Sequence, residues 1–299
     1  MRDYIVSMDL GSNSFRVLKY DCINHKELGE FEKVVATADG LSQSGNISDE
    51  AIQRIVSAIN ESVQKLEFDP TKAICITTAA MRKAKNSVDV LKSIEKETGA
   101  IFQIIDGDKE AELTLLAIKE AIKRHKFDNK KFLFVDIGGA SSELVIVEEK
   151  NVLKKSFDFG IVTMSQSQNP DISLANAKKE ILEFIQDIDL KDFGFYATAG
   201  TPTTLAAIKQ GLNYHTYDKH KVNGTIISKE DLAHYLELFD KLSYEEASIL
   251  VGSRKLEFVI TGVKIFEIFY DTLGFENSIV FDDGLKEGIV LDSLLSFEC

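Results

Sequence analysis

The sequence predicts an α/β fold made of two related domains, and three observations support this class. Apolar runs of strand length alternate with helical segments along the whole chain. One strand, turn and strand motif occurs once in each half. The chain has 299 residues, which is long for one core and suits two domains of roughly 100–200 residues each. A polar, turn-like stretch at 124–130 then separates a first domain, residues 1–124, from a second domain, residues 125–284.

The motif that organises the chain is the segment 136–144, DIGGASSEL. Apolar runs at 132–135 and 144–147 flank it, so it predicts a strand, a tight turn and a second strand. Two glycines leave the turn without side chains and permit left-handed backbone angles, which lets consecutive N–H groups point into a concavity that suits an anion. The residues of this predicted phosphate cradle are Gly138, Gly139, Ala140, Ser141 and Ser142.

Carboxylates stand at both ends of this turn. Asp136 precedes the glycines, and Glu143 follows the serine hydroxyls. Carboxylate oxygens beside amide donors suit a phosphate that is carried with Mg²⁺. A β-hairpin that contains two glycines also has an ordinary structural interpretation, and for the single motif that alternative stays open.

A second copy of the motif lies near the N-terminus, at residues 9–14, DLGSNS. Strand-like runs at 4–10 and 15–20 flank it, and Asp9 corresponds to Asp136. The equivalent loop residues are Gly11, Ser12, Asn13 and Ser14. A phosphate-type turn in each half indicates a duplicated domain with one anion loop per copy.

The rest of the first half holds two charged candidates. The elements expected there are strands at 27–38, 73–77 and 101–105 and helices at 49–66, capped by Ser48, and 106–123. Arg82 lies in a predicted loop at 78–86, at the end of a strand where α/β folds place ligands; a solvated surface charge is the alternative. Glu110 lies in the first turn of the last helix, where stabilisation of the helix dipole explains an acid equally well.

The second half repeats the opening of the first. The expected elements are strands at 132–137, 142–148, 151–158, 195–199 and 222–227, a helix at 174–188, a helix from 205, a helix capped by Ser228, helices at 243–251 and 254–272, and a terminal helix from 285. Gly200 and Thr201 stand where a strand meets a helix, which suits a phosphate or nucleotide. An N-cap with Pro202 as the first helical residue is an equal interpretation.

Composition excludes several classes of protein. A net charge of -13 and a pI near 5.0 argue against general binding to DNA or RNA, which needs a basic face. The scattered Cys22, Cys75 and Cys299 predict reduced thiols rather than disulfides or a zinc site. No signal peptide or apolar run of about 18 residues is evident, so we expect a cytoplasmic protein without a membrane span.

Five blocks together resemble the exopolyphosphatase/guanosine pentaphosphate phosphohydrolase family. The blocks are residues 9–16, 77–86, 105–111, 136–144 and 199–206. The resemblance implies two actin-like (ribonuclease H-like) domains with a cleft between them, and a terminal helix, 285–299, that packs back on the first domain. It also implies Mg²⁺-dependent release of terminal phosphate from polyphosphate or guanosine pentaphosphate.

The resemblance assigns roles to individual residues. Glu110 matches the glutamate that orients or deprotonates the attacking water. Asp136 and Glu143 match acids associated with the metal and water. The positions that match phosphate contacts are Arg16, Arg82, Gly200, Thr201 and the loops 11–14 and 138–142.

The sequence departs from the family pattern at four places. Ala140 and Ala199 stand where glycines are usual, and residues 35–38 lack an arginine commonly found there. Lys255-Leu256-Glu257 replaces an Arg-Ala-Asp before Gly262. The missing arginine motivates one rival hypothesis, a non-catalytic protein that binds guanosine alarmones or polyphosphate. A kinase that transfers phosphate to an acceptor is a third possibility, and the prediction allows a homodimer.

Overall fold

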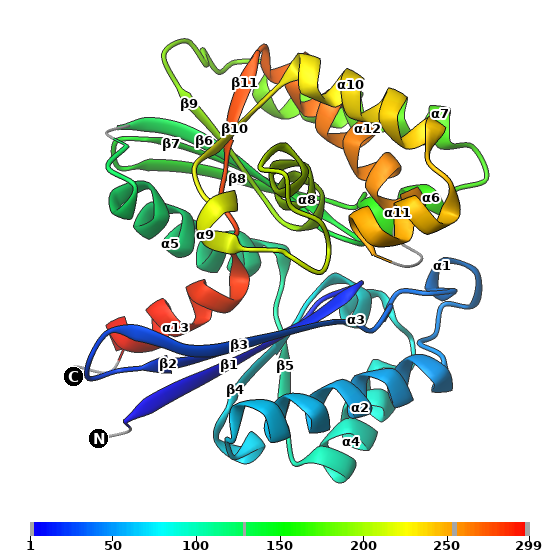
Figure 1. Cartoon of the computed structure of the whole chain (residues 1–299), viewed down its shortest axis with the longest axis vertical. Helices are drawn as coiled ribbons and strands as arrows, with labels where there is room; N and C mark the ends of the chain where they lie inside the picture. The colour runs from blue at the N-terminus through cyan, green and yellow to red at the C-terminus, as the bar shows by residue number, and fades with distance from the viewer. Residues whose placement is uncertain (1–2, 128–129, 253–255, 297–299) are drawn as a thin grey trace. The chain divides into compact units, whose positions relative to one another are not determined.

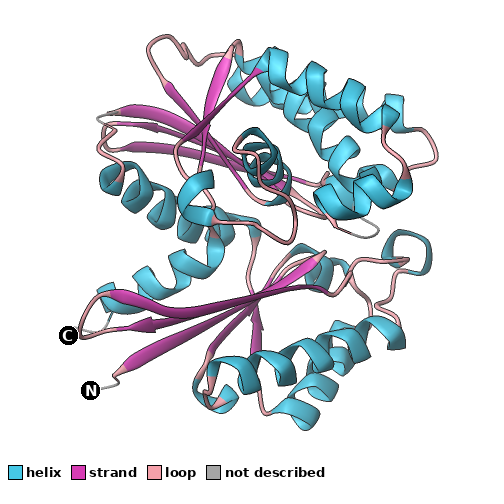
Figure 2. Ribbon diagram, in the orientation of Figure 1, coloured by secondary structure: helices cyan, strands magenta, loops and turns pink. Residues whose placement is uncertain are grey.

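The computed structural model describes residues 3–127, 130–252 and 256–296, and these form an α/β protein (Figure 1). The chain divides into two compact units, Met1–Ala117 with Asp283–Cys299, and Ile118–Asp282. Each unit contains one mixed sheet with helices against it (Figure 2). The predicted α/β class with two related parts is therefore confirmed. The predicted domain limits, after residue 124 and after residue 284, stay a proposal.

The sheet of the first unit has the order β3-β2-β1-β4-β5. Its strands are β1 Tyr4–Leu10, β2 Ser14–Asp21, β3 Lys26–Val34, β4 Ile74–Thr77 and β5 Phe102–Ile104. The β1 strand is antiparallel to β2 and parallel to β4. Helices α2 (Asp49–Leu66) and α4 (Ser87–Thr98) lie against one face, while α13 (Leu285–Ser296) packs on β1 and β2 from the other (Figure 1).

The sheet of the second unit has the order β10-β11-β9-β6-β7-β8. Its strands are β6 Lys131–Ile137, β7 Ser142–Glu148, β8 Asn151–Phe157, β9 Gly194–Thr198, β10 Thr225–Ser228 and β11 Asn277–Val280. The run β8-β7-β6-β9-β11 repeats the order and the strand directions of β3-β2-β1-β4-β5. The repeated motif in the sequence thus corresponds to a repeated topology.

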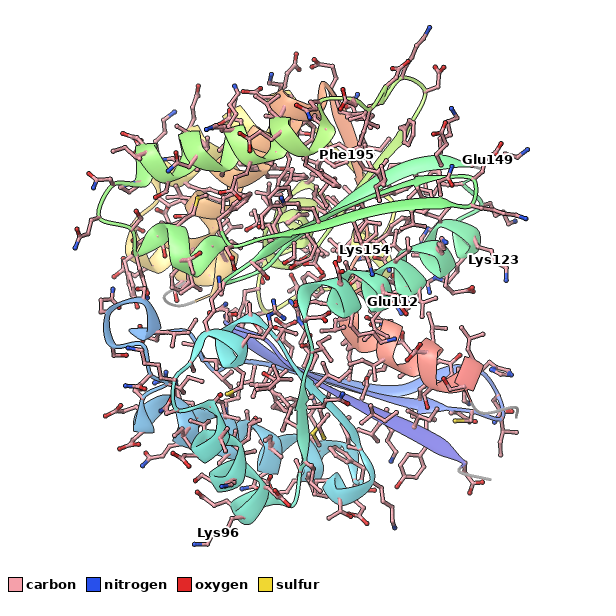
Figure 3. All side chains as sticks on the ribbon, turned by 180° about the vertical axis from the view of Figure 1, so that it is seen from behind. Lys96, Glu112, Lys123, Glu149, Lys154 and Phe195 are labelled. Carbon is pink, nitrogen blue, oxygen red and sulfur yellow. The ribbon has the colours of Figure 1, made fainter. Side chains whose placement is uncertain are left out.

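The helices of the second unit surround a core rich in aromatic residues. They are α6 Ile161–Ser165, α7 Pro170–Ile185, α8 Gly200–Lys209, α9 Lys219–Val222, α10 Lys229–Lys241, α11 Tyr244–Val251 and α12 Leu256–Leu273. Phe195 of β9 points into this core (Figure 3), where its ring meets Phe266 and Tyr270 of α12 edge to face. The remaining long helix, α5 (Gly107–Arg124), contains the boundary between the two units.

Local signals account for many element ends. Ser48 accepts a hydrogen bond from the Ala51 amide at the start of α2, and Ser228 forms a capping box with Asp231 at the start of α10.

Burial raises the pKa of the Cys75 thiol to about 12, which fits an unreactive reduced cysteine. Within the described ranges, no helix has both the length and the hydropathy that a membrane-spanning helix needs.

Several local predictions are wrong. The predicted strand at 27–38 ends at Val34, and the predicted helix from 205 begins at Gly200. The predicted loop at 78–86 contains a short helix, α3 (Ala79–Lys83), since its alanines and long side chains favour helix. The predicted strand at 222–227 begins at Thr225, because Asp218 caps the helical turn α9. Pro202 is the third residue of α8 rather than its first. Helices α1 (Leu41–Ser44), α4, α6 and α9 and the 3-10 turn Pro70–Lys72 were not predicted. Lys255 and Cys299 lie outside the described residues.

Candidate functional site

Both glycine turns have the predicted place, but the reason for the glycines differs from the prediction. Neither Gly11 nor Gly138 has a positive φ, so the turns do not use left-handed angles. A Cβ on Gly138 would instead lie 2.9 Å from the Ser141 carbonyl oxygen, and one on Gly11 would lie 3.2 Å from that of Ser14. A close approach of backbone to backbone thus favours glycine at both positions, and this contact is tighter at Gly138 than at Gly11.

A polar row crosses the second sheet next to its glycine turn. Asp136 of β6 pairs in register with Glu143 of β7 and with Thr198 of β9, and Glu143 pairs with Ser156 of β8. Side chains of residues directly opposite on neighbouring strands share a face, with Cβ atoms about 4.5–5.5 Å apart in an antiparallel pair. Glu143 is 1% exposed and accepts a 2.7 Å hydrogen bond from the Ser156 hydroxyl. The two acids therefore lie next to each other on one face, and the bond from Ser156 fixes the orientation of the Glu143 carboxylate.

Ser142, predicted as part of the phosphate cradle, faces the apolar core instead. Ser142 and Glu143 are neighbours in β7, so their side chains point to opposite faces of the sheet. The residues paired with Ser142, Ile137 and Phe157, belong to the apolar core. Its hydroxyl is fully buried on that face and has no hydrogen-bond partner in the described part of the chain. The methyl group of Ala140 is buried at a site where no positive φ demands glycine. The extra methyl is thus accommodated without backbone strain.

The first sheet has an equivalent row with different charges. Asp9 of β1 pairs with Arg16 of β2, and Arg16 pairs with Glu32 of β3. The Arg16 Nε lies 3.6 Å from Glu32 Oε2. At the position that Glu143 occupies in the second unit, the first unit therefore carries a cation. A cation next to amide donors suits phosphate, whereas an acid pair suits a metal or a water.

Arg82 and Glu110 meet in the first unit. Arg82 Nη1 donates to Glu110 Oε2 at 2.9 Å and to the Ile105 carbonyl oxygen at 2.7 Å. Their side chains are 22% and 12% exposed, so Arg82 is not the solvated surface charge that the alternative interpretation expected. A guanidinium held by two acceptors fixes the orientation of the carboxylate beside it.

Gly200 and Thr201 open α8 directly after β9. Gly200 is exposed, with no atom near the place a Cβ would occupy. Thr201 is 1% exposed, and its side chain fills the space next to Gly262 of α12. The Thr201 hydroxyl therefore lies between two helices, and the exposed part of this turn is the backbone at Gly200.

Comparison with known proteins identifies the family. The model of the Ppx/GppA phosphatase family matches residues 24–297, nearly the whole chain. This chain belongs to the Ppx/GppA phosphatase family. The resemblance seen in the sequence is thereby confirmed.

Curated relatives of this Ppx/GppA chain are distant. It is 25% identical over 311 residues to a bifunctional 3-dehydroquinate synthase/phosphatase of Fusobacterium nucleatum, covering 96% of this chain and 46% of that protein. It is 26% identical over 297 residues to a guanosine-5'-triphosphate,3'-diphosphate pyrophosphatase of Aliivibrio fischeri strain MJ11, covering 95% and 58%. The chain therefore spans about half the length of the curated relatives it matches.

Solved structures share the fold over their full length. An exopolyphosphatase from Cytophaga hutchinsonii has a TM-score of 0.84 at 21% identity, covering 99% of each chain. The Aquifex aeolicus member of the Ppx/GppA family has a TM-score of 0.74 at 21% identity, again covering 99% of each chain. These likenesses show the fold alone.

The acid pair of the second unit fits the divalent metal that is typical of the Ppx/GppA family. Within the described ranges, no group of three or more His, Cys, Asp or Glu side chains could hold a metal ion by itself. Mg²⁺ usually keeps several waters and binds through one or two carboxylates plus substrate phosphates. The cross-strand pair of Asp136 and Glu143 supplies that minimal set of oxygens.

Sequence reasoning missed Ser156, the hydrogen-bond partner of Glu143. A signal was present, because only two residues separate the predicted strands 142–148 and 151–158. Such a turn fixes the register of a hairpin, and it places Glu143 opposite Ser156. Glu149, labelled in Figure 3, lies in that turn.

Proposed function

We propose that this protein is a Mg²⁺-dependent hydrolase that releases the terminal phosphate of inorganic polyphosphate or guanosine pentaphosphate. The observation that carries the proposal is the pair of equivalent glycine turns, each beside a row of charged side chains in fixed register. Membership of a phosphatase family supports the reaction class. Hydrolysis of a phosphoanhydride needs little covalent chemistry, so positioning and charge stabilisation suffice.

The proposal assigns tasks to the charged groups of both turns and to Glu110. Glu110 orients the attacking water and accepts its proton, and the bond from Arg82 holds the Glu110 carboxylate in place. Arg16, Arg82 and the backbone amides of both turns bind phosphate oxygens. Asp136 and Glu143 hold Mg²⁺, which when bound neutralises charge on the phosphates. The Ser156 hydroxyl keeps Glu143 in one orientation.

Replacement of the acids tests these roles. Glu110→Gln removes the proton acceptor and Asp136→Asn removes a charged metal ligand, so each should lower kcat for phosphate release at least about 100-fold. Glu112→Gln is the matched control, because Glu112 lies on the same helix with a side chain 52% exposed. Unchanged phosphate release in both site variants, on polyphosphate and on guanosine pentaphosphate, would refute the assigned roles.

The substrate is decided by a direct comparison. Phosphate release from short polyphosphate, long polyphosphate and guanosine pentaphosphate is measured side by side, with Mg²⁺ and with a chelator. We expect release from at least one of them and its loss in the chelator. Tight binding of a guanosine alarmone in calorimetry without any turnover would instead support the regulator, which the absence of arginine from residues 35–38 favours. Phosphate appearing on an added acceptor would indicate a kinase.

A further inference from the structure

Each glycine turn is held from behind by the segment that follows the third strand of its unit. In the first unit this segment is residues 35–38, called brace 1 here. The Val35 and Ala36 amides both donate to the Asn13 carbonyl oxygen, at 2.9 and 2.8 Å, and the Ala38 amide donates to that of Ser12 at 2.8 Å. The carbonyl side of the first turn is therefore occupied by brace 1.

The second unit has the same arrangement with an unrelated sequence. Here the segment is residues 160–163, called brace 2. The Ile161 amide donates to the Gly138 carbonyl oxygen at 2.9 Å. The amides of Val162 and Thr163 donate to the Gly139 carbonyl oxygen at 2.7 and 3.3 Å. The first amides of α6, which a helix leaves without partners inside itself, are thus used by the turn.

The braces determine which way the amides of the turns point. In a trans peptide the N–H of one residue points opposite to the C=O of the residue before it, and all described peptides are trans. Since the carbonyls of Gly138 and Gly139 face brace 2, the N–H groups of Gly139 and Ala140 point away from it. By the same geometry the N–H of Asn13 points away from brace 1. A concavity of N–H groups on the open side of a turn binds an anion.

Arg54 of α2 fixes brace 1. Its Nε donates to the Val35 carbonyl oxygen at 2.8 Å, and its Nη2 donates to that of Ala36 at 3.2 Å. The peptide between Val35 and Ala36 therefore accepts from Arg54 on one side and donates to Asn13 on the other. A chain of hydrogen bonds of this kind is mutually polarising, and it starts from a permanent positive charge.

Gly160 and Thr163 fix brace 2. A Cβ on Gly160 would lie 2.7 Å from three backbone atoms of the turn, the Gly138 oxygen, the Gly139 carbonyl carbon and the Ala140 nitrogen. The Thr163 hydroxyl accepts from the Gly160 amide at 2.8 Å, which joins the two ends of the brace. Only a residue without a side chain permits this contact.

We propose that Arg54, Gly160 and Thr163 are positioning residues that set the two turns for phosphate binding by holding their carbonyls from behind. None of them needs to touch the substrate, because they act through the peptides of the turns. The inference rests on the proposed function in one respect, namely that the turns bind phosphate.

The first test follows the turn amides directly and does not need turnover. Pyrophosphate is added to the ¹⁵N-labelled full chain, and the amide resonances of Asn13, Gly139 and Ala140 are monitored. We expect them to shift in the wild type. Arg54→Met loses both charge-assisted hydrogen bonds to brace 1, so it should raise about tenfold the pyrophosphate concentration needed to shift the Asn13 amide. Lys65→Met, on the exposed end of the same helix, should change nothing.

The second test uses brace 2 and kinetics. Thr163→Val should raise KM about tenfold with a smaller change in kcat. Thr163→Ser keeps the hydroxyl, so its KM should be close to that of the wild type. Ser165→Ala is the control, because its hydroxyl bonds within α6 to the Val162 carbonyl. Gly160→Ala should disturb the Gly139 and Ala140 resonances even without pyrophosphate. A melting temperature close to that of the wild type verifies that each variant folds.

The outcomes separate the two proposals. If turnover occurs but pyrophosphate shifts none of the three amides, the inference is wrong and the proposed function stands. The same holds if turnover occurs and both Arg54→Met and Thr163→Val bind pyrophosphate as the wild type does. If the amides shift as expected but no substrate releases phosphate, the proposed function is wrong and the inference stands. If neither shifts nor turnover are seen, both are wrong.

Discussion

Ala199, the residue before α8, has a backbone conformation that favours glycine. Its φ of 75° and ψ of -174° lie in a region that costs a residue with a side chain roughly 1–3 kcal/mol. We expect Ala199→Gly to raise the free energy of unfolding by about 1 kcal/mol, after the larger loss of backbone entropy of glycine is included.

Urea denaturation measures this change, and a second glycine substitution provides the control. Ala206→Gly, inside α8, should lower the free energy of unfolding by about 1–2 kcal/mol, because glycine is unfavourable where the backbone is already helical and a buried methyl is lost. Opposite signs for the two variants would support strain at Ala199. A loss of stability in both would show that Ala199 is accommodated without strain.

Thr37 of brace 1 has a buried hydroxyl that the fold does not use. The residue is 0% exposed, and its Oγ1 has no hydrogen-bond partner in the described part of the chain. An unsatisfied buried hydroxyl costs about 1–3 kcal/mol in protein mutational data. Thr37→Val should therefore raise the free energy of unfolding by about 1 kcal/mol. Thr37→Ser keeps the hydroxyl and loses a methyl, so it should lower the free energy of unfolding. Thermal melts measure both variants. A Thr37→Val variant less stable than Thr37→Ser would indicate that a water bonds the hydroxyl.

At the scale of elements, two glycines allow pairs of helices to approach closely. A Cβ on Gly262 of α12 would lie 1.9 Å from the Thr201 hydroxyl oxygen of α8. A Cβ on Gly288 of α13 would lie 2.0 Å from the Leu113 carbonyl oxygen of α5. The first obstacle is a side chain, which a second substitution can remove. The second obstacle is a backbone carbonyl, which no substitution removes.

Gly262→Ala should lower the free energy of unfolding by about 1–3 kcal/mol, and adding Thr201→Ala should recover part of that loss, because it removes the obstructing hydroxyl. Gly288→Ala should lower the free energy of unfolding more than Gly262→Ala does, since the obstacle is the backbone carbonyl of Leu113, which no side-chain substitution removes. Chemical denaturation of the three variants measures the order. An equal loss for Gly262→Ala with and without Thr201→Ala would contradict the assigned contact.

At the scale of the molecule, local pattern was enough to predict most of the strands and the place of the two turns, but not the order of the strands in each sheet. The apolar runs at 132–135 and 144–147 predicted the β6–β7 hairpin almost to the residue, because both faces of these strands are buried and a short turn joins them. The same hairpin aligned Asp136 with Glu143. The braces were not predictable, because bonds such as Ile161 to Gly138 join residues far apart in sequence through backbone atoms that any residue type supplies. The contact of Arg82 with Glu110 is non-local for the same reason.

The net charge of -13 predicts how the whole molecule meets a polyanion. A negative protein repels a negative substrate over a Debye length, which falls from about 30 Å at 0.01 M salt to about 8 Å at 0.15 M. At saturating Mg²⁺, raising NaCl across this range should therefore lower KM for tripolyphosphate and leave kcat nearly unchanged. Steady-state phosphate release measures both constants, and tetramethylammonium chloride controls for specific effects of sodium. A KM that rises steeply with salt would mean that the cations at Arg16 and Arg82 dominate the field that the substrate meets.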